Sequence, residues 1–235
     1  MVRKVGLIIQ AHMGSERLPG KVIKTINGIS VLGYVITRLR DVQNADYIIV
    51  ATSTLPVDDI IEKESLKYGA LVFRGDDTDV LARFYGAAKK YELEVIARIC
   101  SDNLFIDPDI VQEEISIYSK TDYDIVTSGT TIPLGLGTEV FSFQALEEAH
   151  EKATLPYEHE HVTPYIYGHG VAYYSEIESD GSKYRLTLDT TEDWEFINEI
   201  SSRVNPLNCR LSDIMEVLVR EPKLLQINKD VVQRL

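Results

Sequence analysis

The sequence contains few cysteines, a deficit of basic side chains and no long hydrophobic run. Its two cysteines, Cys100 and Cys209, have neither metal-site spacing nor the pattern of a secreted disulfide framework, so they indicate two buried thiols in a reducing compartment. No apolar run approaches the ~20 residues that a membrane span needs. The N-terminus lacks the apolar region and cleavage site of a signal peptide. These absences predict a soluble, cytoplasmic protein.

The shortage of basic residues excludes two classes of partner. The 24 Lys and Arg residues stand against 37 Asp and Glu residues, which gives a formal net charge of -13. A nucleic-acid binder neutralises phosphates with Lys and Arg, and a basic face is what holds a protein to an anionic membrane. A small polyanionic substrate is compatible with this net charge, because a few well-placed cations can bind it in a protein whose surface is otherwise acidic. Otherwise the excess acid serves solubility.

Short apolar segments alternate with helical patterns over the first 130 residues. Strands are predicted at residues 5–9, 47–51, 70–73, 94–98 and 123–127, and helices at 31–39, 56–67, 80–91 and 108–118. Such alternation predicts an α/β fold, with a mostly parallel sheet flanked by helices.

The pattern changes after about residue 130. Strands are predicted at residues 138–142, 171–177 and 184–188, and helices at 143–152, 192–203 and 211–220. The second half therefore has a mixed α+β character. Because the chain has no Pro/Ser-rich linker, low-complexity tract or internal repeat, residues 1–235 are expected to form one domain, in which 1–130 bind a nucleotide and 131–235 complete the site.

The loop after the first strand is the first place to expect a ligand, since open α/β sheets bind ligands at the carboxyl ends of their strands. Gly14 and Gly20 let backbone amides approach an anion, and Ser15, Arg17 and Lys21 supply hydrogen-bond donors. The loop is neither a Walker A loop nor a G-x-G-x-x-G fingerprint. On the residues alone it is either a phosphate site or a polar turn.

The same loop, residues 10–21, reads QAHMGSERLPGK. It resembles the Q-A-R-M-G-S-x-R-L-P-G-K signature of the cytidylyltransferases that include spore coat polysaccharide biosynthesis proteins, with acylneuraminate and deoxy-manno-octulosonate (KDO) cytidylyltransferases as more distant relatives. The loop and the segment His161-Val-Thr-Pro-Tyr165 are the specific parts of the match. Supporting segments follow in order over nearly the whole chain, at residues 50–53, 73–75, 79–85, 101–103, 106–108, 139–141, 160–167, 186–190 and 192–193.

The resemblance implies a Rossmann-like nucleotidyltransferase fold that binds CTP and Mg²⁺. The expected reaction transfers CMP from CTP to a sugar acid or related acceptor, releases pyrophosphate and serves cell-surface polysaccharide biosynthesis. Residues 131–235 would then bind the acceptor and form a homodimer. The chemistry suits the residues, because transfer at a phosphate needs positioning and charge neutralisation more than covalent catalysis.

The resemblance also implies roles for individual residues. Lys21 and Arg17 would hold the triphosphate, the main-chain amides of Ala11 to Gly14 would cradle it, and Asp102 would act with them in catalysis. Asp102 and Asp189 would bind Mg²⁺, which takes few protein carboxylates and keeps water and phosphate oxygens as its other ligands. The expected nucleotide-binding residues are Gln10, Ala11, His12, Met13, Gly14, Ser15, Asp79, Arg83 and Arg98, and the expected acceptor-binding residues are Glu139, Glu160 and His161.

Structural roles compete with these assignments. Asp102 is alternatively an N-cap or turn residue, and Asp189 alternatively caps a helix with Glu192 in a capping box. Asp79 and Arg83 lie one helical turn apart, so an internal ion pair is their alternative. These alternatives stay open on the sequence.

Other charged side chains give weaker signals. Arg98 lies amid apolar residues and needs an anion or a carboxylate as partner, while Arg74 and Arg185 are weaker cationic candidates. His159 and His161 form an H-x-H pair that suggests zinc, but i,i+2 side chains on a helix point to different faces and no further ligands converge in the sequence. His161 with Glu160 would rather contact the acceptor or a dimer partner, or have a structural role.

Two departures from the family pattern bear on function. His12 stands where Arg is usual, and an imidazole holds a triphosphate less firmly than a permanent guanidinium. Gly137-Thr138 replaces the usual Asp-Val before Glu139. These departures motivate one alternative function, a non-catalytic nucleotide-binding protein. The enzymatic alternatives are a sugar-1-phosphate nucleotidyltransferase and a nucleotide-sugar glycosyltransferase, which share the architecture.

Overall fold

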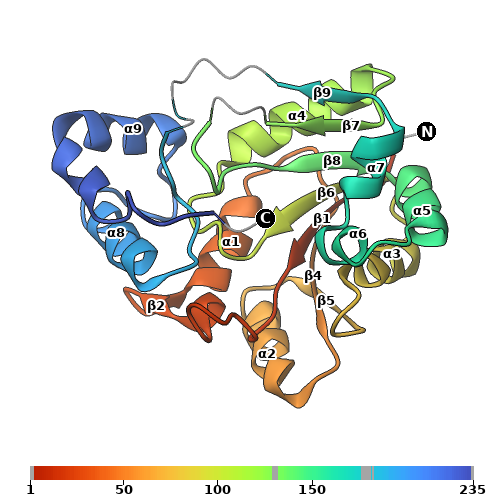
Figure 1. The fold of residues 1–235 in the computed structure, drawn as a ribbon, viewed down its shortest axis with the longest axis horizontal. Coiled ribbons are helices and arrows are strands. Elements are labelled where there is room, and N and C mark those ends of the chain that lie inside the picture. The colour runs from red at the N-terminus through yellow and green to blue at the C-terminus, as the bar shows by residue number, and fades with distance from the viewer. Residues whose placement is uncertain (1–2, 129–131, 176–180, 182, 234–235) are drawn as a thin grey trace.

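A seven-stranded sheet forms the centre of the molecule, with strand order β5-β4-β1-β6-β8-β7-β9 (Figure 1). The computed structural model describes residues 3–128, 132–175, 181 and 183–233. The strands of the sheet are β1 (Val5–Gln10), β4 (Tyr47–Ser53), β5 (Leu71–Gly75), β6 (Val95–Cys100), β7 (Ile125–Thr127), β8 (Glu139–Ser142) and β9 (Ala172–Tyr174).

Most strand pairs in this sheet are parallel. β1 pairs with β4 on one side and β6 on the other, β4 pairs with β5, and β7 pairs with β9, all in parallel. Only β8 runs against its neighbours β6 and β7 among the described strands. β1 can lie inside the sheet because its apolar residues are buried on both faces. The expected fold, a mostly parallel sheet flanked by helices, is confirmed.

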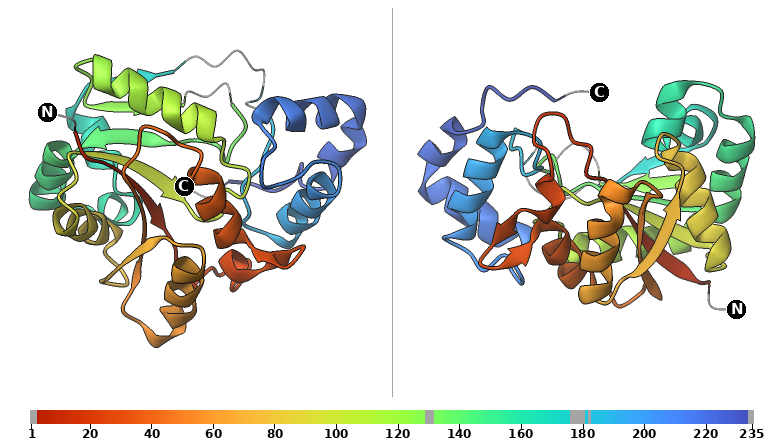
Figure 2. Two further views of the ribbon diagram at one scale, coloured as in Figure 1. Left: turned by 180° about the vertical axis from the view of Figure 1, so that it is seen from behind. Right: turned by 90° about the horizontal axis from the view of Figure 1, so that it is seen from below.

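Helices cover both faces of the sheet (Figure 2). Leu7 and Ile9 of β1 belong to the same apolar cluster as the buried faces of α1, α2 and α4. Ile8 belongs to the opposite cluster, with α3, α5, α7 and Val162, the residue after α6. The bounds are α1 (Val31–Leu39), α2 (Asp59–Lys67), α3 (Val80–Lys90), α4 (Pro108–Lys120), α5 (Phe143–Lys152), α6 (Pro156–His161) and α7 (Pro164–His169), with the 3₁₀ turns η1 (Lys21–Ile23), η2 (Pro56–Asp58) and η3 (Pro222–Gln226).

The last two helices, α8 (Thr191–Ser201) and α9 (Leu211–Arg220), build a third apolar cluster beside the sheet. Phe196 and Ile214 pack there with Tyr34 of α1 and with Leu104 and Phe105, which follow β6. Figure 2 shows these helices at one side of the molecule, next to the segment that leads into α1. Among the residues that the structure describes, no helix is both long and apolar enough to cross a bilayer.

The strands and helices expected in the first half are confirmed within a few residues, as are the strand at 138–142 and the helices at 143–152, 192–203 and 211–220. The strand expected at 184–188 is wrong. Tyr184, Leu186 and Leu188 alternate toward the core as in a strand, but the segment has one isolated bridge, between Arg185 and Leu134, in place of a ladder. Of the strand expected at 171–177, Ala172–Tyr174 forms β9, and residues 176 and 177 lie outside the described residues.

Three short elements did not figure among the predictions. Helices α6 and α7 each begin with proline at the first helical turn. The hairpin of β2 (Thr25–Ile26) and β3 (Ile29–Ser30) turns through Asn27 and Gly28, both at positive φ. An Asn-Gly pair between apolar residues is a strong signal for such a turn, so this hairpin was readable from the sequence.

Candidate active site

The loop after β1 is held by internal contacts at the carboxyl end of the sheet. Asp58, almost fully buried at the start of α2, accepts a hydrogen bond from the Met13 amide at 2.8 Å and one from the Ser53 hydroxyl at 2.5 Å. The Ala11 amide donates to the carbonyl of Ala51 at 3.2 Å. Two of the four amides expected to cradle a phosphate are therefore already used, and those of His12 and Gly14 remain. This corrects the expected cradle of Ala11 to Gly14.

His12 lies exposed on this loop. Surrounding protein atoms and then the Lys21 ammonium lower the pKa of its imidazole. The neutral ring is therefore favoured near neutral pH, so His12 does not replace the permanent charge of an arginine.

Lys21 lies between two carboxylates from distant parts of the chain. Its ammonium is 2.6 Å from Asp102 Oδ2 and 2.8 Å from Asp189 Oδ1, and the three side chains are 9%, 19% and 14% exposed. Burial alone would lower the pKa of Lys21, but the two carboxylates outweigh it and raise the pKa. We call Lys21, Asp102 and Asp189 the lysine–carboxylate cluster.

Two guanidinium groups complete the surroundings of Asp189. Arg185 lies 2.6 Å and Arg17 lies 3.2 Å from Asp189 Oδ2. Burial would raise the pKa of Asp189, but Lys21 and then Arg185 and Arg17 lower it, so the carboxylate is ionised. Asp193, fully buried, binds Arg185 at 2.8 Å. Sequence reasoning missed Asp193, although Thr190-x-x-Asp193 has the capping-box spacing.

The helix-capping alternatives for these aspartates are wrong, whereas the turn alternative for Asp102 is confirmed, because the Asn103 amide donates to the Cys100 carbonyl across it. Helix α8 is capped by Thr190, with Asp193 completing the box, instead of Asp189 with Glu192. The next helix after Asp102 is α4, and its N-cap is Asp107. Both Asp102 and Asp189 thus use their carboxylates at the cluster.

The donor set of this cluster suits Mg²⁺. Asp102 and Asp189 direct one oxygen each at the same cation position, which Lys21 fills. Over residues 3–128, 132–175, 181 and 183–233, no group of three or more His, Cys, Asp or Glu side chains could hold a metal ion. Mg²⁺ binds through one or two protein carboxylates when phosphate oxygens and waters supply its other ligands, and it needs no site built from protein atoms alone.

Arg98 has the carboxylate partner that its apolar surroundings require. Its guanidinium lies 2.5 Å from Glu139 Oε2, its Nε donates to Gln10 Oε1 at 3.1 Å, and Thr163 donates to Glu139 Oε1 at 3.0 Å. Burial would lower the pKa of Arg98, but Glu139 raises it. Arg98 and Glu139 are directly opposed on β6 and β8. Removing one partner of such a buried pair costs about 3–5 kcal/mol.

A cavity of about 820 Å³ opens between these two groups of side chains. It brings together eight of the expected site residues, which are Gln10, Arg17, Arg98, Asp102, Glu139, Glu160, His161 and Asp189. Thr187 and Gln233 also line it and were missed by sequence reasoning. Its size suits a nucleotide or sugar ligand.

A strained turn between α6 and α7 leads into this cavity. Val162 has φ 70° and ψ -53°, and the Thr163 amide donates to the His161 carbonyl at 2.8 Å, which is the geometry of a γ-turn. Such a conformation is costly for a β-branched residue. The Val162 side chain is fully buried, and the turn leaves His161 at the cavity and Thr163 on Glu139.

Asp79 and Arg83 do not pair with each other, so the ion-pair alternative is wrong. Asp79 caps α3 by accepting from the Ala82 amide and lies 2.9 Å from His159 Nδ1. Arg83 donates to the carbonyls of Asp76 and Asp77 at 2.6 and 2.8 Å. Neither residue lines the large cavity, and their expected role in nucleotide binding stays a prediction.

The two histidines of the H-x-H pair have separate surroundings, since His159 faces Asp79 and His161 lines the cavity. Of the weaker cationic candidates, Arg185 joins the site whereas Arg74 binds Asp59 and Glu62 on α2.

Cys209 is buried as expected, but Cys100 is half-buried and lines the cavity. Burial raises the pKa of the Cys100 thiol to about 11, so it is protonated.

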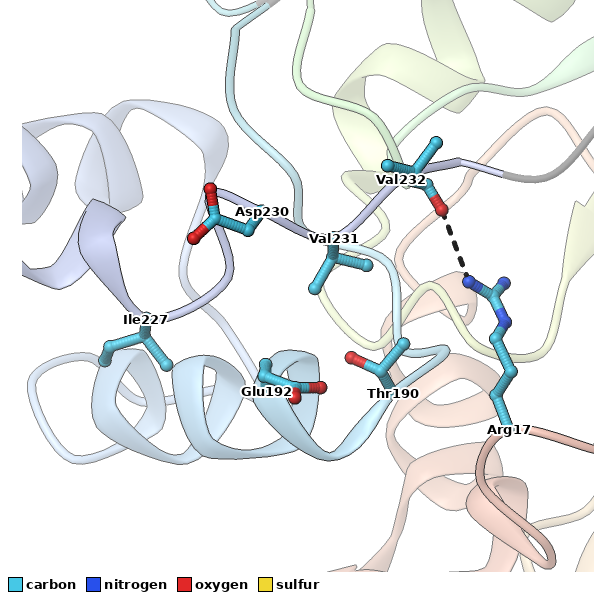
Figure 3. Close-up of a pocket in the computed structure, with 7 residues that line it drawn as sticks. All are labelled: Arg17, Thr190, Glu192, Ile227, Asp230, Val231 and Val232. Atoms are coloured by element: carbon cyan, nitrogen blue, oxygen red, sulfur yellow. Dashed lines mark hydrogen bonds between the residues drawn. The ribbon is translucent and has the colours of Figure 1, made fainter.

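The C-terminal segment passes beside the loop after β1. Figure 3 shows Arg17 reaching toward the carbonyl of Val232, to which it donates at 3.4 Å. A second cavity of about 530 Å³ lies here, between Arg17, the start of α8 and residues 230–232. Arg17 therefore links the loop after β1 to Asp189 and to the C-terminal segment. No local sequence pattern could predict these contacts, because the partners lie far from Arg17 in the sequence.

Comparison with known proteins gives consistent matches. Residues 7–222 match the family model described as cytidylyltransferase. The chain is 36% identical to the uncharacterized protein MJ1063 of Methanocaldococcus jannaschii over 97% of this chain and 95% of that protein. It is 33% identical to the spore coat polysaccharide biosynthesis protein SpsF of Bacillus subtilis over 92% and 94%. A solved cytidylyltransferase from Leptospira borgpetersenii superposes with a TM-score of 0.90, at 32% identity over 99% of this chain and all of that one.

Proposed function

The chain belongs to the cytidylyltransferase family, and on that premise we propose that it transfers CMP from CTP to a hydroxyl group of a sugar-type acceptor. The acceptor oxygen forms a bond to the α-phosphorus, the bond between that phosphorus and the bridging oxygen of the β-phosphate breaks, and pyrophosphate leaves. The hydroxyl proton passes to water in the open cavity. A nucleotidyltransferase of this kind needs cations at the phosphates and a positioned acceptor.

The lysine–carboxylate cluster is the observation that carries this proposal. It joins a lysine of the loop after β1 to two carboxylates, at the carboxyl end of β6 and before α8. Asp102 and Asp189 would hold Mg²⁺, which neutralises charge on a triphosphate. Lys21 and Arg17 would then contact the phosphates, and the amides of His12 and Gly14 would donate to them.

The name of one relative supports a biological setting. SpsF is named for spore coat polysaccharide biosynthesis. We accordingly propose that the product serves cell-surface polysaccharide biosynthesis. We propose further that the reaction occurs in the cytoplasm and that the enzyme is a homodimer. Family membership does not favour the sugar-1-phosphate nucleotidyltransferase, glycosyltransferase or non-catalytic alternatives.

Calorimetric titration with CTP in the presence of Mg²⁺ tests the nucleotide half of the proposal. CTP should bind more tightly than ATP, GTP and UTP, and Asp102→Asn should weaken binding. A hydrogen bond or ligand contact to a charged group contributes about 1.5–3 kcal/mol, which corresponds to about a ten- to hundredfold change in Kd. The matched control is Asp122→Asn, an exposed aspartate remote from the cluster. Equal binding of all four nucleotides, or none, would refute the proposal.

A further inference from the structure

The two carboxylate oxygens of Asp189 have different partners. Oδ1 lies 2.8 Å from the Lys21 ammonium, at the position that the proposed function gives to a metal ion. Oδ2 lies 2.6 Å from Nη2 of Arg185 and 3.2 Å from Nη2 of Arg17. The guanidinium contacts at Oδ2 therefore keep Oδ1 directed at the cation position, and the orientation of this carboxylate depends on what holds the two arginines.

The two arginines are held to different degrees. The Arg185 side chain is 9% exposed, and its Nε and Nη2 donate to the two oxygens of Asp193 at 2.8 and 3.0 Å. Asp193 is fully buried, and its Oδ2 also accepts from the amides of Asp189 and Thr190 at 3.0 and 3.1 Å. The Arg17 side chain is 23% exposed and lies on a loop. Arg185 is therefore the fixed partner of Asp189, whereas Arg17 is able to turn toward a triphosphate.

The C-terminal segment holds Arg185 from a further side. Gln233 Oε1 accepts from Arg185 Nη1 at 2.5 Å, so all three nitrogens of the guanidinium group have an acceptor. The buried Asn228 donates to the Arg185 carbonyl at 3.2 Å and to Asp193 Oδ1 at 3.0 Å. We call Arg185, Asp193, Asn228 and Gln233 the Arg185 network. It connects the segment before α8 to the C-terminal segment, and Asp189 lies at its edge toward the large cavity.

We propose that Arg185 is a positioning residue of the metal site, which holds the Asp189 carboxylate with Oδ1 directed at the cation. This inference rests on the proposed function and adds the Arg185 network to it. The planar guanidinium group binds Asp193 and Asp189 at once and fixes one carboxylate relative to the other, which a single ammonium on a flexible chain cannot do. Partners that orient a ligating carboxylate in this way contribute a factor of about 10–100 in metal affinity.

The metal dependence of CTP binding tests the inference. Calorimetry gives the Kd for CTP in EDTA and in saturating Mg²⁺, and the ratio of the two values measures how far the metal strengthens binding. Arg185→Lys keeps the charge but loses the planar group, and it should lower this ratio by about tenfold or more. The Kd in EDTA should stay close to the wild-type value. A role confined to folding would change both Kd values alike and leave their ratio unchanged.

Two further variants accompany Arg185→Lys. Gln233→Ala removes one hydrogen bond to the guanidinium group and should lower the ratio by at least about threefold. Because the Gln233 side chain is exposed, this variant is expected to fold even where Arg185→Lys does not. Arg203→Lys is the matched control, since Arg203 also bridges two carboxylates, Glu199 at 2.8 Å and Glu221 at 2.9 Å. It follows the end of α8 opposite to Asp189 and should leave the ratio unchanged.

The outcomes separate the inference from the proposed function. If CTP binds but Arg185→Lys and Gln233→Ala keep the wild-type ratio, or if Mg²⁺ does not strengthen CTP binding to the wild type, the inference is refuted and nucleotide binding stands. If binding in EDTA is below detection for every protein, the Kd values in Mg²⁺ are compared, and equal values for the wild type and the folded variants refute the inference. If CTP binds the wild type under neither condition, the proposed function fails and the inference fails with it.

Discussion

Replacing Lys21 by methionine tests whether the two carboxylates of the cluster form a cation site. The ammonium lies within 2.8 Å of both Asp102 and Asp189 in a largely buried position. Methionine keeps most of the side-chain volume and removes the charge, so the variant leaves the two carboxylates close together without the cation between them.

The structure sets the expected size of the effect. Breaking a buried ion pair costs about 3–5 kcal/mol. Asp189 keeps Arg17 and Arg185 as partners, whereas Asp102 loses its ion-pair partner among the described residues. The loss of unfolding free energy should therefore be at the lower end, about 3 kcal/mol. Saturating Mg²⁺ should restore most of it, because a cation at one hundred times its Kd contributes about 2.7 kcal/mol.

Urea unfolding with EDTA or with saturating Mg²⁺ measures both effects on the wild type and on Lys21→Met. Mg²⁺ should stabilise the variant more than the wild type, in which the Lys21 ammonium competes for the same oxygens. Lys120→Met, at the exposed end of α4, controls for the loss of a surface lysine. Equal stabilisation of both proteins by Mg²⁺, or a loss below about 1 kcal/mol in EDTA, would show that the carboxylates do not depend on a shared cation.

Two further substitutions probe buried polar groups outside the cavity lining. Burial raises the pKa of Glu114 well above its ordinary 4.5, so the native state keeps a proton that the unfolded chain releases. The unfolding free energy of the wild type should therefore fall as the pH rises above that value, and Glu114→Gln should remove this fall. Urea unfolding at about pH 5 and about pH 8 measures both proteins, and an equal change in their unfolding free energies between the two pH values would contradict the prediction. Arg38, 1% exposed, donates to the carbonyls of Ile106, Pro206 and Cys209 at 2.7 Å each. Arg38→Met should lower the unfolding free energy by at least about 3 kcal/mol, since each orphaned carbonyl costs about 1–3 kcal/mol; a loss under 1 kcal/mol in urea would refute this.

The sequence alone specified the elements whose signals are local. The uninterrupted apolar run of β1 marked a strand buried on both faces, and Pro108 marked the start of α4. The loop from Gln10 to Lys21 stood out because its glycines and cations follow that strand. The segment 184–188 shows the limit of such signals, since its alternating apolar side chains pack in the cluster with α8 and α9 while its backbone forms no ladder.

The partners of the charged side chains were decided by the tertiary structure. Lys21 meets Asp102 and Asp189 across 81 and 168 residues of sequence, and Arg98 meets Glu139 across 41. The last pair exists because β8 enters the sheet antiparallel between β6 and β7. The hydrophobic period of a strand predicts which face of the sheet each side chain occupies. The order of the strands decides which residue of the neighbouring strand lies beside it. The sequence therefore determined which strand ends carry charged groups, while the sheet decided that Glu139 neutralises Arg98, because only the assembled fold brings those charges within reach of one another.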